Sequence, residues 1–315
     1  MLALLFPGQA SQAVGMGRDL RQANATARQL FELADALTGR PITQLCTDGP
    51  LEHLTATDVA QPAVVTTSLA ALAVLRDALG VAPDAVAGHS VGEFAAYVAA
   101  DVLDPEAALR LVHVRAQAMA SACRLVDGSM AAIIGLDEAS VRQACMTASH
   151  EGSSVEVANV NAPGQLIVSG AREAIERLAE AARAAGARRV LPLNVGGPFH
   201  SIYMQPAAEP LARALDDVPL RPARVPVVLN ASAEPTTDPR ALQAELAQQV
   251  YSPVLWTRTL ERLAALGCDH FLEVGPGTVL TGLTKRTLPG AATASFGTLD
   301  DLDAVRAFLG APSPA

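Results

Sequence analysis

The sequence is poor in aromatic side chains, in basic charge and in paired cysteines. Aromatic residues make up 3% of the 315 residues, and 23 Lys and Arg against 32 Asp and Glu give a formal net charge of −9. This acidic balance excludes a general nucleic-acid binder, which needs a basic surface. The four cysteines (Cys46, Cys123, Cys145 and Cys268) are far apart and form no C-x-x-C pair. They favour isolated thiols in a reducing compartment over a disulfide framework or a metal site.

A long hydrophobic run and a basic leader are also missing. No uninterrupted apolar stretch reaches the ~18 residues that a membrane-spanning helix needs. The chain begins Met1-Leu2-Ala3-Leu4-Leu5-Phe6, without the positive charges of a signal peptide, so this segment predicts a first strand. We therefore expect a cytoplasmic protein that does not engage a membrane.

Aliphatic residues are abundant. Half of the residues are hydrophobic, with Ala, Leu and Val prominent, which is typical of a parallel sheet covered by helices. Strand-like and helical segments alternate along residues 2–6, 25–38, 63–79 and 81–87, and this alternation predicts right-handed crossovers. We expect the last core strand at residues 270–273 and a frayed tail at 312–315. A chain of this length favours one large domain with an insertion, or two domains.

The middle of the chain follows a different order. The pattern predicts a strand, a helix, two strands joined by a turn, a helix and a strand, at residues 130–135, 138–148, 155–160, 165–169, 173–185 and 189–195. This β-α-β-β-α-β order is the ferredoxin-like unit. We therefore predict a ferredoxin-like subdomain at residues 126–194, inserted into an α/β domain formed by residues 1–125 and 195–315.

The segment Gly88-His89-Ser90-Val91-Gly92 is a G-x-S-x-G sequence between a predicted strand and a predicted helix. This context is typical of a nucleophile elbow, a turn too tight for side chains on either side of the serine. The Ser90 hydroxyl would be exposed above the sheet, near backbone N–H groups at the helix N-terminus. The alternative is a plain strand-to-helix turn.

A nucleophilic serine needs a base, and His200 is the best placed of the six histidines. It lies in the loop Gly196 to Ser201, where the chain re-enters the larger domain and an interdomain cleft is expected. The alternative is a hydrogen-bonded loop histidine. His89 adjoins the serine and cannot easily fold back as its base, so we expect an orienting role for it. No acid between Ser90 and His200 stands out as a third triad member, which weakens a simple esterase interpretation and leaves a backbone carbonyl or amide to orient the base.

Arg115 has apolar neighbours at helical spacing, and burying a cation there is costly unless an anion or a polar group meets it. The sequence leaves two interpretations open, a fork for a substrate carboxylate and a structural salt bridge. The loop Phe6 to Gln12 follows the first strand, where small and polar residues face the ligand crevice of an α/β sheet. Its backbone N–H groups could complete an oxyanion hole.

Taken together, these segments resemble the malonyl-coenzyme A:acyl carrier protein transacylases of fatty-acid synthesis and the acyltransferase domains of polyketide synthases. The resemblance spans nearly the whole chain. The matching segments, in order, are Phe6-Pro7-Gly8-Gln9 with Ser11-Gln12, Gln61-Pro62-Ala63, Gly88-His89-Ser90-Val91-Gly92-Glu93, Arg115, Asn159 with Asn161-Ala162-Pro163-Gly164-Gln165, Pro198-Phe199-His200-Ser201, Gln249 to Pro253 with Trp256, and Glu273-Val274-Gly275-Pro276-Gly277. The fold that this resemblance implies is an α/β-hydrolase-like core with a parallel sheet and an inserted ferredoxin-like subdomain.

The resemblance implies a role for each matching site residue. Ser90 would be the nucleophile, His200 the base and Arg115 the carboxylate clamp. The other positions that it implicates in substrate binding are Gln9 and Val91 (oxyanion N–H groups), His89, Phe199 (unbranched malonyl units) and Gln249 (a backbone carbonyl beside the histidine). Ala10 departs from the family, which usually has glycine there.

The implied reaction moves a malonyl group from malonyl-CoA to the phosphopantetheine thiol of acyl carrier protein through a malonyl-serine ester. It implies no cofactor and no metal, since malonyl-CoA is a substrate, and we expect a monomer. Two related alternatives are a standalone acyltransferase of a polyketide synthase and the transacylase subunit of malonate decarboxylase. A serine hydrolase or thioesterase is the alternative from another class, and it would have no reason to place Arg115 in the pocket.

Overall fold

The computed structural model describes residues 1–310, so the tail predicted at residues 312–315 lies outside the described residues. The larger of its two sheets has six strands in the order β10-β9-β1-β2-β7-β8. Every neighbouring pair is parallel except β7 and β8. The strands are β1 (Leu2–Phe6), β2 (Ala85–Gly88), β7 (Val227–Val228), β8 (Pro235–Thr236), β9 (His270–Val274) and β10 (Ala292–Phe296).

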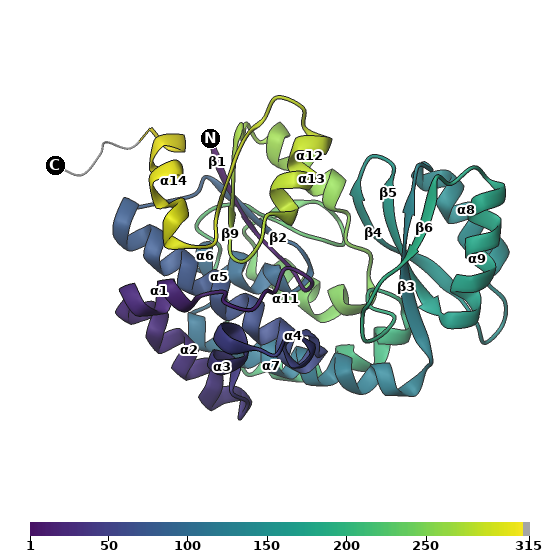
Figure 1. Ribbon diagram of the computed structural model, residues 1–315, viewed down its shortest axis with the longest axis horizontal. Helices are drawn as coiled ribbons and strands as arrows, with labels where there is room; N and C mark the ends of the chain where they lie inside the picture. Colours follow the sequence, from purple (N-terminus) through teal and green to yellow (C-terminus); the bar gives the residue numbers. More distant parts are fainter. Residues whose placement is uncertain (311–315) are drawn as a thin grey trace.

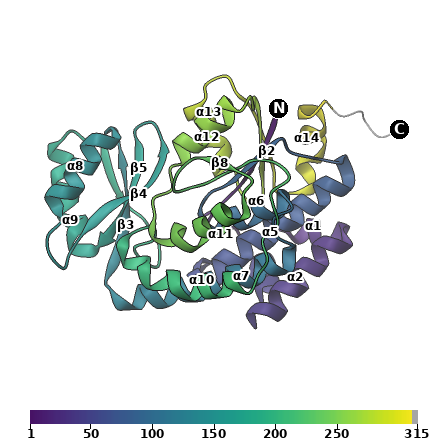
Figure 2. The same ribbon diagram turned by 180° about the vertical axis from the view of Figure 1, so that it is seen from behind.

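Helices cover both faces of this sheet (Figures 1 and 2). Side chains alternate between the two faces of a strand, so Leu4 and Phe6 of β1 join one hydrophobic cluster while Ala3 and Leu5 join another. The helices of the larger part are α1 (Arg18–Ala23), α2 (Ala25–Thr38), α3 (Ile42–Asp48), α4 (Leu51–Thr55), α5 (Thr57–Leu79), α6 (Glu93–Ala99), α7 (Pro105–Ala122), α10 (Ala208–Asp216), α11 (Pro239–Gln248), α12 (Trp256–Ala265), α13 (Val279–Thr287) and α14 (Leu302–Phe308). Short 3₁₀ turns are η1 (Ser90–Gly92), η2 (Cys123–Leu125), η3 (Ile202–Ala207), η4 (Gln249–Tyr251) and η5 (Leu299–Asp301).

The second sheet is antiparallel and stands beside the first, at the right of Figure 1. Its order is β4-β5-β3-β6, and the helices α8 (Glu138–Ala148) and α9 (Arg172–Ala184) pack against it. The strands are β3 (Gly128–Ile134), β4 (Val155–Ala162), β5 (Gln165–Ala171) and β6 (Arg189–Pro192). The predicted β-α-β-β-α-β order is therefore present, and the α/β class with a parallel sheet is confirmed. The division into domains at residues 125/126 and 194/195 stays a prediction.

Several predicted boundaries were wrong. Residues 270–273 are not the last core strand, because β10 follows β9 and pairs with it in parallel. β10 is a half-exposed edge strand of small residues, so it lacks the apolar run by which a buried strand is detected. The helix predicted from residue 63 begins at Thr57 and continues through Pro62, although a proline has no N–H for the hydrogen bonds of a helix interior. Residues 81–84 form a loop, since β2 is confined to Ala85–Gly88.

α5 is the one helix in residues 1–310 that is long and apolar enough to cross a membrane by length and composition. However, 89% of its most apolar window is buried inside the protein. Such burial is typical of a core helix, and α5 packs against α2 and α7 beneath the larger sheet.

Candidate active site

The G-x-S-x-G segment forms a tight turn between β2 and α6. Ser90 has a φ of +53°, in the left-handed region. A Cβ added to Gly88 would overlap the backbone of Gly92, and one added to Gly92 would overlap the backbone of Phe6 on the neighbouring strand β1. Both glycines are therefore sterically required, as expected of an elbow that presents its central side chain at the end of the sheet.

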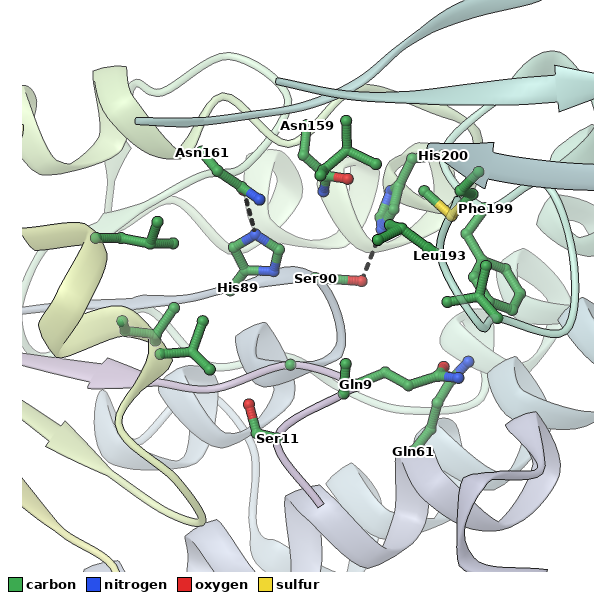
Figure 3. Close-up of a pocket in the computed structure, with 18 of the residues that line it drawn as sticks. Gln9, Ser11, Gln61, His89, Ser90, Asn159, Asn161, Leu193, Phe199 and His200 are labelled. Carbon is green, nitrogen blue, oxygen red and sulfur yellow. Dashed lines mark hydrogen bonds between the residues drawn. The ribbon is translucent and has the colours of Figure 1, made fainter. Parts of the chain in front are cut away.

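The Ser90 hydroxyl faces His200, although 110 residues separate them in the chain. The distance from Ser90 Oγ to His200 Nε2 is 2.7 Å (Figure 3). On the other side of the ring, Nδ1 lies 3.0 Å from the Gln249 carbonyl oxygen and 3.1 Å from that of Ser252. Carbonyl oxygens only accept hydrogen bonds, so Nδ1 carries the proton and Nε2 is the acceptor for the serine hydroxyl. Backbone carbonyls thus orient the ring in place of a carboxylate.

His200 is held in its neutral form. Burial, and then the positive charge of Arg115 and the neighbouring His89, lower the pKa of His200 to about 3, while the two carbonyl hydrogen bonds act in the opposite direction. A neutral imidazole with a free Nε2 lone pair is the form that can accept a proton from a serine hydroxyl.

The side chain of Arg115, which lies on α7, extends to the Ser90 hydroxyl. Only 1% of its surface is exposed. Its Nη1 donates to Gln61 Oε1 at 2.5 Å, and its Nη2 donates to Gln249 Oε1 at 2.8 Å and to Ser90 Oγ at 3.2 Å. Its Nε has no hydrogen-bond partner within residues 1–310. Burial lowers the pKa of Arg115 to about 10 and the charge of Glu93 opposes this, so the side chain remains a cation at neutral pH.

The structural salt bridge proposed as an alternative for Arg115 is absent from the described part of the chain, where no carboxylate lies within ion-pair distance of it. The guanidinium instead donates hydrogen bonds to the neutral side-chain amides of Gln61 and Gln249. A buried cation whose partners are all neutral can still bind an anionic ligand.

Asn230, which the sequence analysis did not single out, holds the elbow. Its Oδ1 accepts from Ser90 N at 2.7 Å, and its Nδ2 donates to Gly88 O at 2.6 Å and to Glu93 Oε1 at 2.7 Å. Because the Ser90 N–H is already used, an oxyanion beside Ser90 has to be stabilised by other N–H groups. The sequence offered little reason to select Asn230, since an asparagine two residues beyond a short strand is typical of an ordinary turn.

A cavity of about 190 Å³ opens above Ser90 between the two sheets. Polar side chains from the larger part and from β4 surround the serine (Figure 3). The apolar part of the wall consists of Met119, Met130, Ile167, Leu193, Val195, Phe199, Val279, Leu280 and Leu283. The cavity therefore combines a nucleophile and a cation with an apolar lining, as small-molecule sites do.

The cavity brings together six of the predicted site residues: Gln9, His89, Ser90, Arg115, Phe199 and His200. His89 turns away from Ser90, and its Nε2 lies 3.0 Å from Asn161 Oδ1. Val91 is fully buried beside Ser90, and the role of its N–H stays a prediction.

Gln249 does not line the cavity. Its backbone carbonyl lies beside the histidine, 3.0 Å from His200 Nδ1, as the resemblance implied, and its part in substrate binding stays a prediction. Its fully buried side chain lies behind Arg115 and donates to Ser90 O at 2.8 Å. The loop from β1 carries Ala10 at a φ of +79°, a region that favours glycine. The departure from glycine at this position therefore places a methyl group on a left-handed backbone. Within residues 1–310, no group of three or more His, Cys, Asp or Glu side chains could hold a metal ion.

Comparisons with known proteins agree with this geometry. Residues 3–309 match the family model described as acyl transferase domain. The chain is 45% identical to a malonyl CoA-acyl carrier protein transacylase of Escherichia coli strain K12 over 90% of this chain and 92% of that one. It is 42% identical to one of Bacillus subtilis over 90% of each chain.

Solved structures show the same similarity. An acyl carrier protein S-malonyltransferase from Vibrio cholerae superposes with a TM-score of 0.91 at 40% identity, over 96% of this chain and 99% of that chain. A malonyl-transacylase solved in complex with a type II PKS acyl-carrier protein gives a TM-score of 0.92 at 39% identity, over 98% and 99% of the two chains. The chain therefore belongs to the acyltransferase family that includes the malonyl CoA-acyl carrier protein transacylases.

Proposed function

We propose that this enzyme transfers a malonyl group from malonyl-CoA to the phosphopantetheine thiol of an acyl carrier protein, through a malonyl ester on Ser90. The observation that carries the proposal is the position of Arg115, a buried cation 3.2 Å from Ser90 Oγ with no carboxylate partner in the described residues. An acyl group that ends in a carboxylate would complete this arrangement, whereas an uncharged acyl group would leave the cation unmatched.

In the first half-reaction, His200 Nε2 accepts the proton from Ser90 Oγ while Oγ attacks the thioester carbonyl carbon of malonyl-CoA. The backbone N–H groups of Gln9 and Val91 would stabilise the oxyanion, each contributing about 10²–10³ in rate. The intermediate collapses when the carbon–sulfur bond breaks, and the protonated His200 returns its proton to the departing thiol. The malonyl ester of Ser90 remains.

In the second half-reaction, the thiol of the carrier protein replaces coenzyme A. His200 accepts the thiol proton, the sulfur attacks the ester carbonyl, and Ser90 Oγ leaves with the proton from the imidazole. His200 is therefore the base in both half-reactions. The steps need only this chain's own groups, so we propose that no cofactor and no metal takes part.

Arg115 would hold the malonyl carboxylate in both half-reactions. Arginine has five N–H donors, and the hydrogen bonds to Gln61, Gln249 and Ser90 use three of them. A charge-assisted hydrogen bond to the carboxylate contributes about 1.5–3 kcal/mol. Phe199, on the apolar wall, would favour an unbranched malonyl unit. A hydrolase or thioesterase could use Ser90 and His200, but Arg115 would serve no purpose in it.

The carrier is proposed from the relatives, whose names specify acyl carrier protein. We propose fatty-acid synthesis as the pathway. A polyketide synthase carrier is the alternative, and a relative solved with such a carrier supports it. The transacylase subunit of malonate decarboxylase would need a third type of carrier. We further propose a cytoplasmic monomer that binds neither nucleic acid nor membranes, in keeping with the net charge of −9.

The test is intact-protein mass spectrometry after mixing the enzyme with malonyl-CoA and then with candidate carrier proteins. We expect a mass increase of one malonyl group on the wild type and none on Ser90→Ala, and the increase should move to the cognate carrier. An adduct on Ser90→Ala would contradict the nucleophile, and release of the acyl group as free malonate in the presence of every carrier would favour a hydrolase.

A further inference from the structure

Behind the cavity, one neutral amide lies between two buried ionisable groups. Gln249 Oε1 accepts from Arg115 Nη2 at 2.8 Å, and Gln249 Nε2 donates to Glu93 Oε2 at 2.6 Å. Arg115, Gln249 and Glu93 are exposed by 1%, 0% and 0%. A cation and a carboxylate thus interact through an amide instead of directly.

The neighbours fix the orientation of this amide. Its Nε2 faces two acceptors, Glu93 Oε2 and the Ser90 carbonyl oxygen at 2.8 Å, while its Oε1 faces a guanidinium, which can only donate. The reversed amide would place its oxygen against two oxygens and its NH₂ group against Arg115. The structure therefore allows one orientation, and that orientation requires Glu93 to accept.

Glu93 is the first residue of α6, directly after the elbow, and accepts three N–H groups. Asn230 N and Nδ2 donate to its Oε1 at 2.8 and 2.7 Å, and Gln249 donates to its Oε2. Burial, and then the charge of Glu245, raise the pKa of Glu93 well above its ordinary value, although the hydrogen bonds from Asn230 and Gln249 and the charge of Arg115 act in the opposite direction. All of its polar contacts are donors, so the geometry corresponds to the carboxylate form.

We propose that Glu93 is a positioning residue for acyl-group selection, acting as the remote counter-ion of Arg115 through Gln249. A direct ion pair would occupy the guanidinium that the substrate carboxylate needs. With an amide between them, Glu93 stabilises the buried charge of Arg115 and fixes Gln249, and Gln249 in turn holds both Arg115 Nη2 and the backbone of Ser90. This inference rests on the proposed malonyl transfer.

The critical variant is Glu93→Gln, which has nearly the same shape. Its new NH₂ group must face either Gln249 Nε2, which loses one hydrogen bond, or the two N–H donors of Asn230, which loses two. If Gln249 reverses to accept from it, an NH₂ group then faces Arg115. We expect the ratio of kcat/KM for malonyl-CoA to kcat/KM for acetyl-CoA to fall about tenfold or more, because acetyl has no carboxylate for Arg115 to hold.

Glu273→Gln is the matched control. Glu273 is also fully buried and accepts from Leu280 N, Thr281 N and Thr281 Oγ1, and none of these hydrogen bonds involves Gln249 or Arg115. The Glu273→Gln variant should be less stable than the wild type, with an unchanged ratio of kcat/KM for malonyl-CoA to kcat/KM for acetyl-CoA. Should Glu93→Gln fail to fold, Gln249→Met breaks the same connection at its centre and should lower the ratio as well.

A parallel loss of kcat/KM for both donors in Glu93→Gln, or no loss, would overturn the inference. So would a further change of the ratio when Glu93→Gln is added to Arg115→Ala, where no guanidinium remains to position. The malonyl adduct on the wild type tests the proposed function separately. If that adduct does not form, a crystal structure of Glu93→Gln decides: a retained hydrogen bond from Arg115 Nη2 to Gln249 Oε1 contradicts the connection, and its loss supports it.

Discussion

The environment of His200 makes a quantitative prediction about acidic pH. A histidine with its ordinary pKa of about 6.5 would be only about 3% neutral at pH 5. Burial and the charge of Arg115 lower the pKa of His200 to about 3, so nearly all of it stays neutral at that pH. Acylation of Ser90 requires the neutral ring. We therefore expect the acylation rate at pH 5 to remain close to its value at pH 7.5, instead of falling about thirtyfold.

The assay is rapid-quench acylation followed by intact mass, at pH values from 4.5 to 8. Acetyl-CoA is the better donor for this purpose, because its acyl group has no carboxylate that titrates. Circular dichroism at each pH checks that the enzyme stays folded, and Ser90→Ala gives the background. An acid limb in kcat/KM with a midpoint near pH 6.5 would refute the reasoning, since it would show a solvated histidine that Arg115 does not influence.

Three further outcomes follow from the elbow, the loop after β1 and the buried base. Gly92→Ala should prevent folding or cost more than about 3 kcal/mol in urea unfolding, because its Cβ would overlap the Phe6 backbone; a stable, active variant would contradict this. Ala10→Gly should relieve about 1 kcal/mol of left-handed strain, offset in part by the entropy of glycine in the unfolded chain, and a lower melting temperature would count against that. A buried His200 with a lowered pKa contributes stability that is present above pH 6.5 and is lost as the pH falls toward 3, by about 2 kcal/mol at pH 5. Urea unfolding of His200→Gln should therefore depend less on pH over this range than that of the wild type, and equal dependence would argue against a buried neutral ring.

Periodicity and motif spacing predicted much of the fold. The alternation of strands and helices indicated a parallel sheet, and the order of elements in residues 130–195 indicated the antiparallel subdomain that β3 to β6 form. The missed strand has a physical explanation. β10 is half exposed, so its pairing is set by the neighbouring strand β9 and not by a local apolar pattern.

The site was predictable to the extent that its residues lie in local motifs. The G-x-S-x-G pattern, with a strand before it and a helix after it, favoured Ser90 as a nucleophile over a plain turn. His200 and Arg115 were left with two interpretations each, and the resemblance then implied a role for all three. Asn230 could not be identified, because its function depends on contacts with Ser90 and Glu93, 140 and 137 residues away in sequence. The same holds for the side chain of Gln249. Such support residues are defined by long-range packing, which a single sequence does not encode locally.

The central claim is that this pocket selects an acyl group with a terminal carboxylate, and Arg115 tests it most directly. The measurement is the ratio of kcat/KM for malonyl-CoA to kcat/KM for acetyl-CoA in wild type, Arg115→Ala and Arg115→Lys. We expect the ratio to fall about 10–10²-fold in Arg115→Ala and to recover in part in Arg115→Lys, which keeps the charge without the planar fork. An unchanged ratio in Arg115→Ala would contradict the account and make Arg115 a purely structural residue.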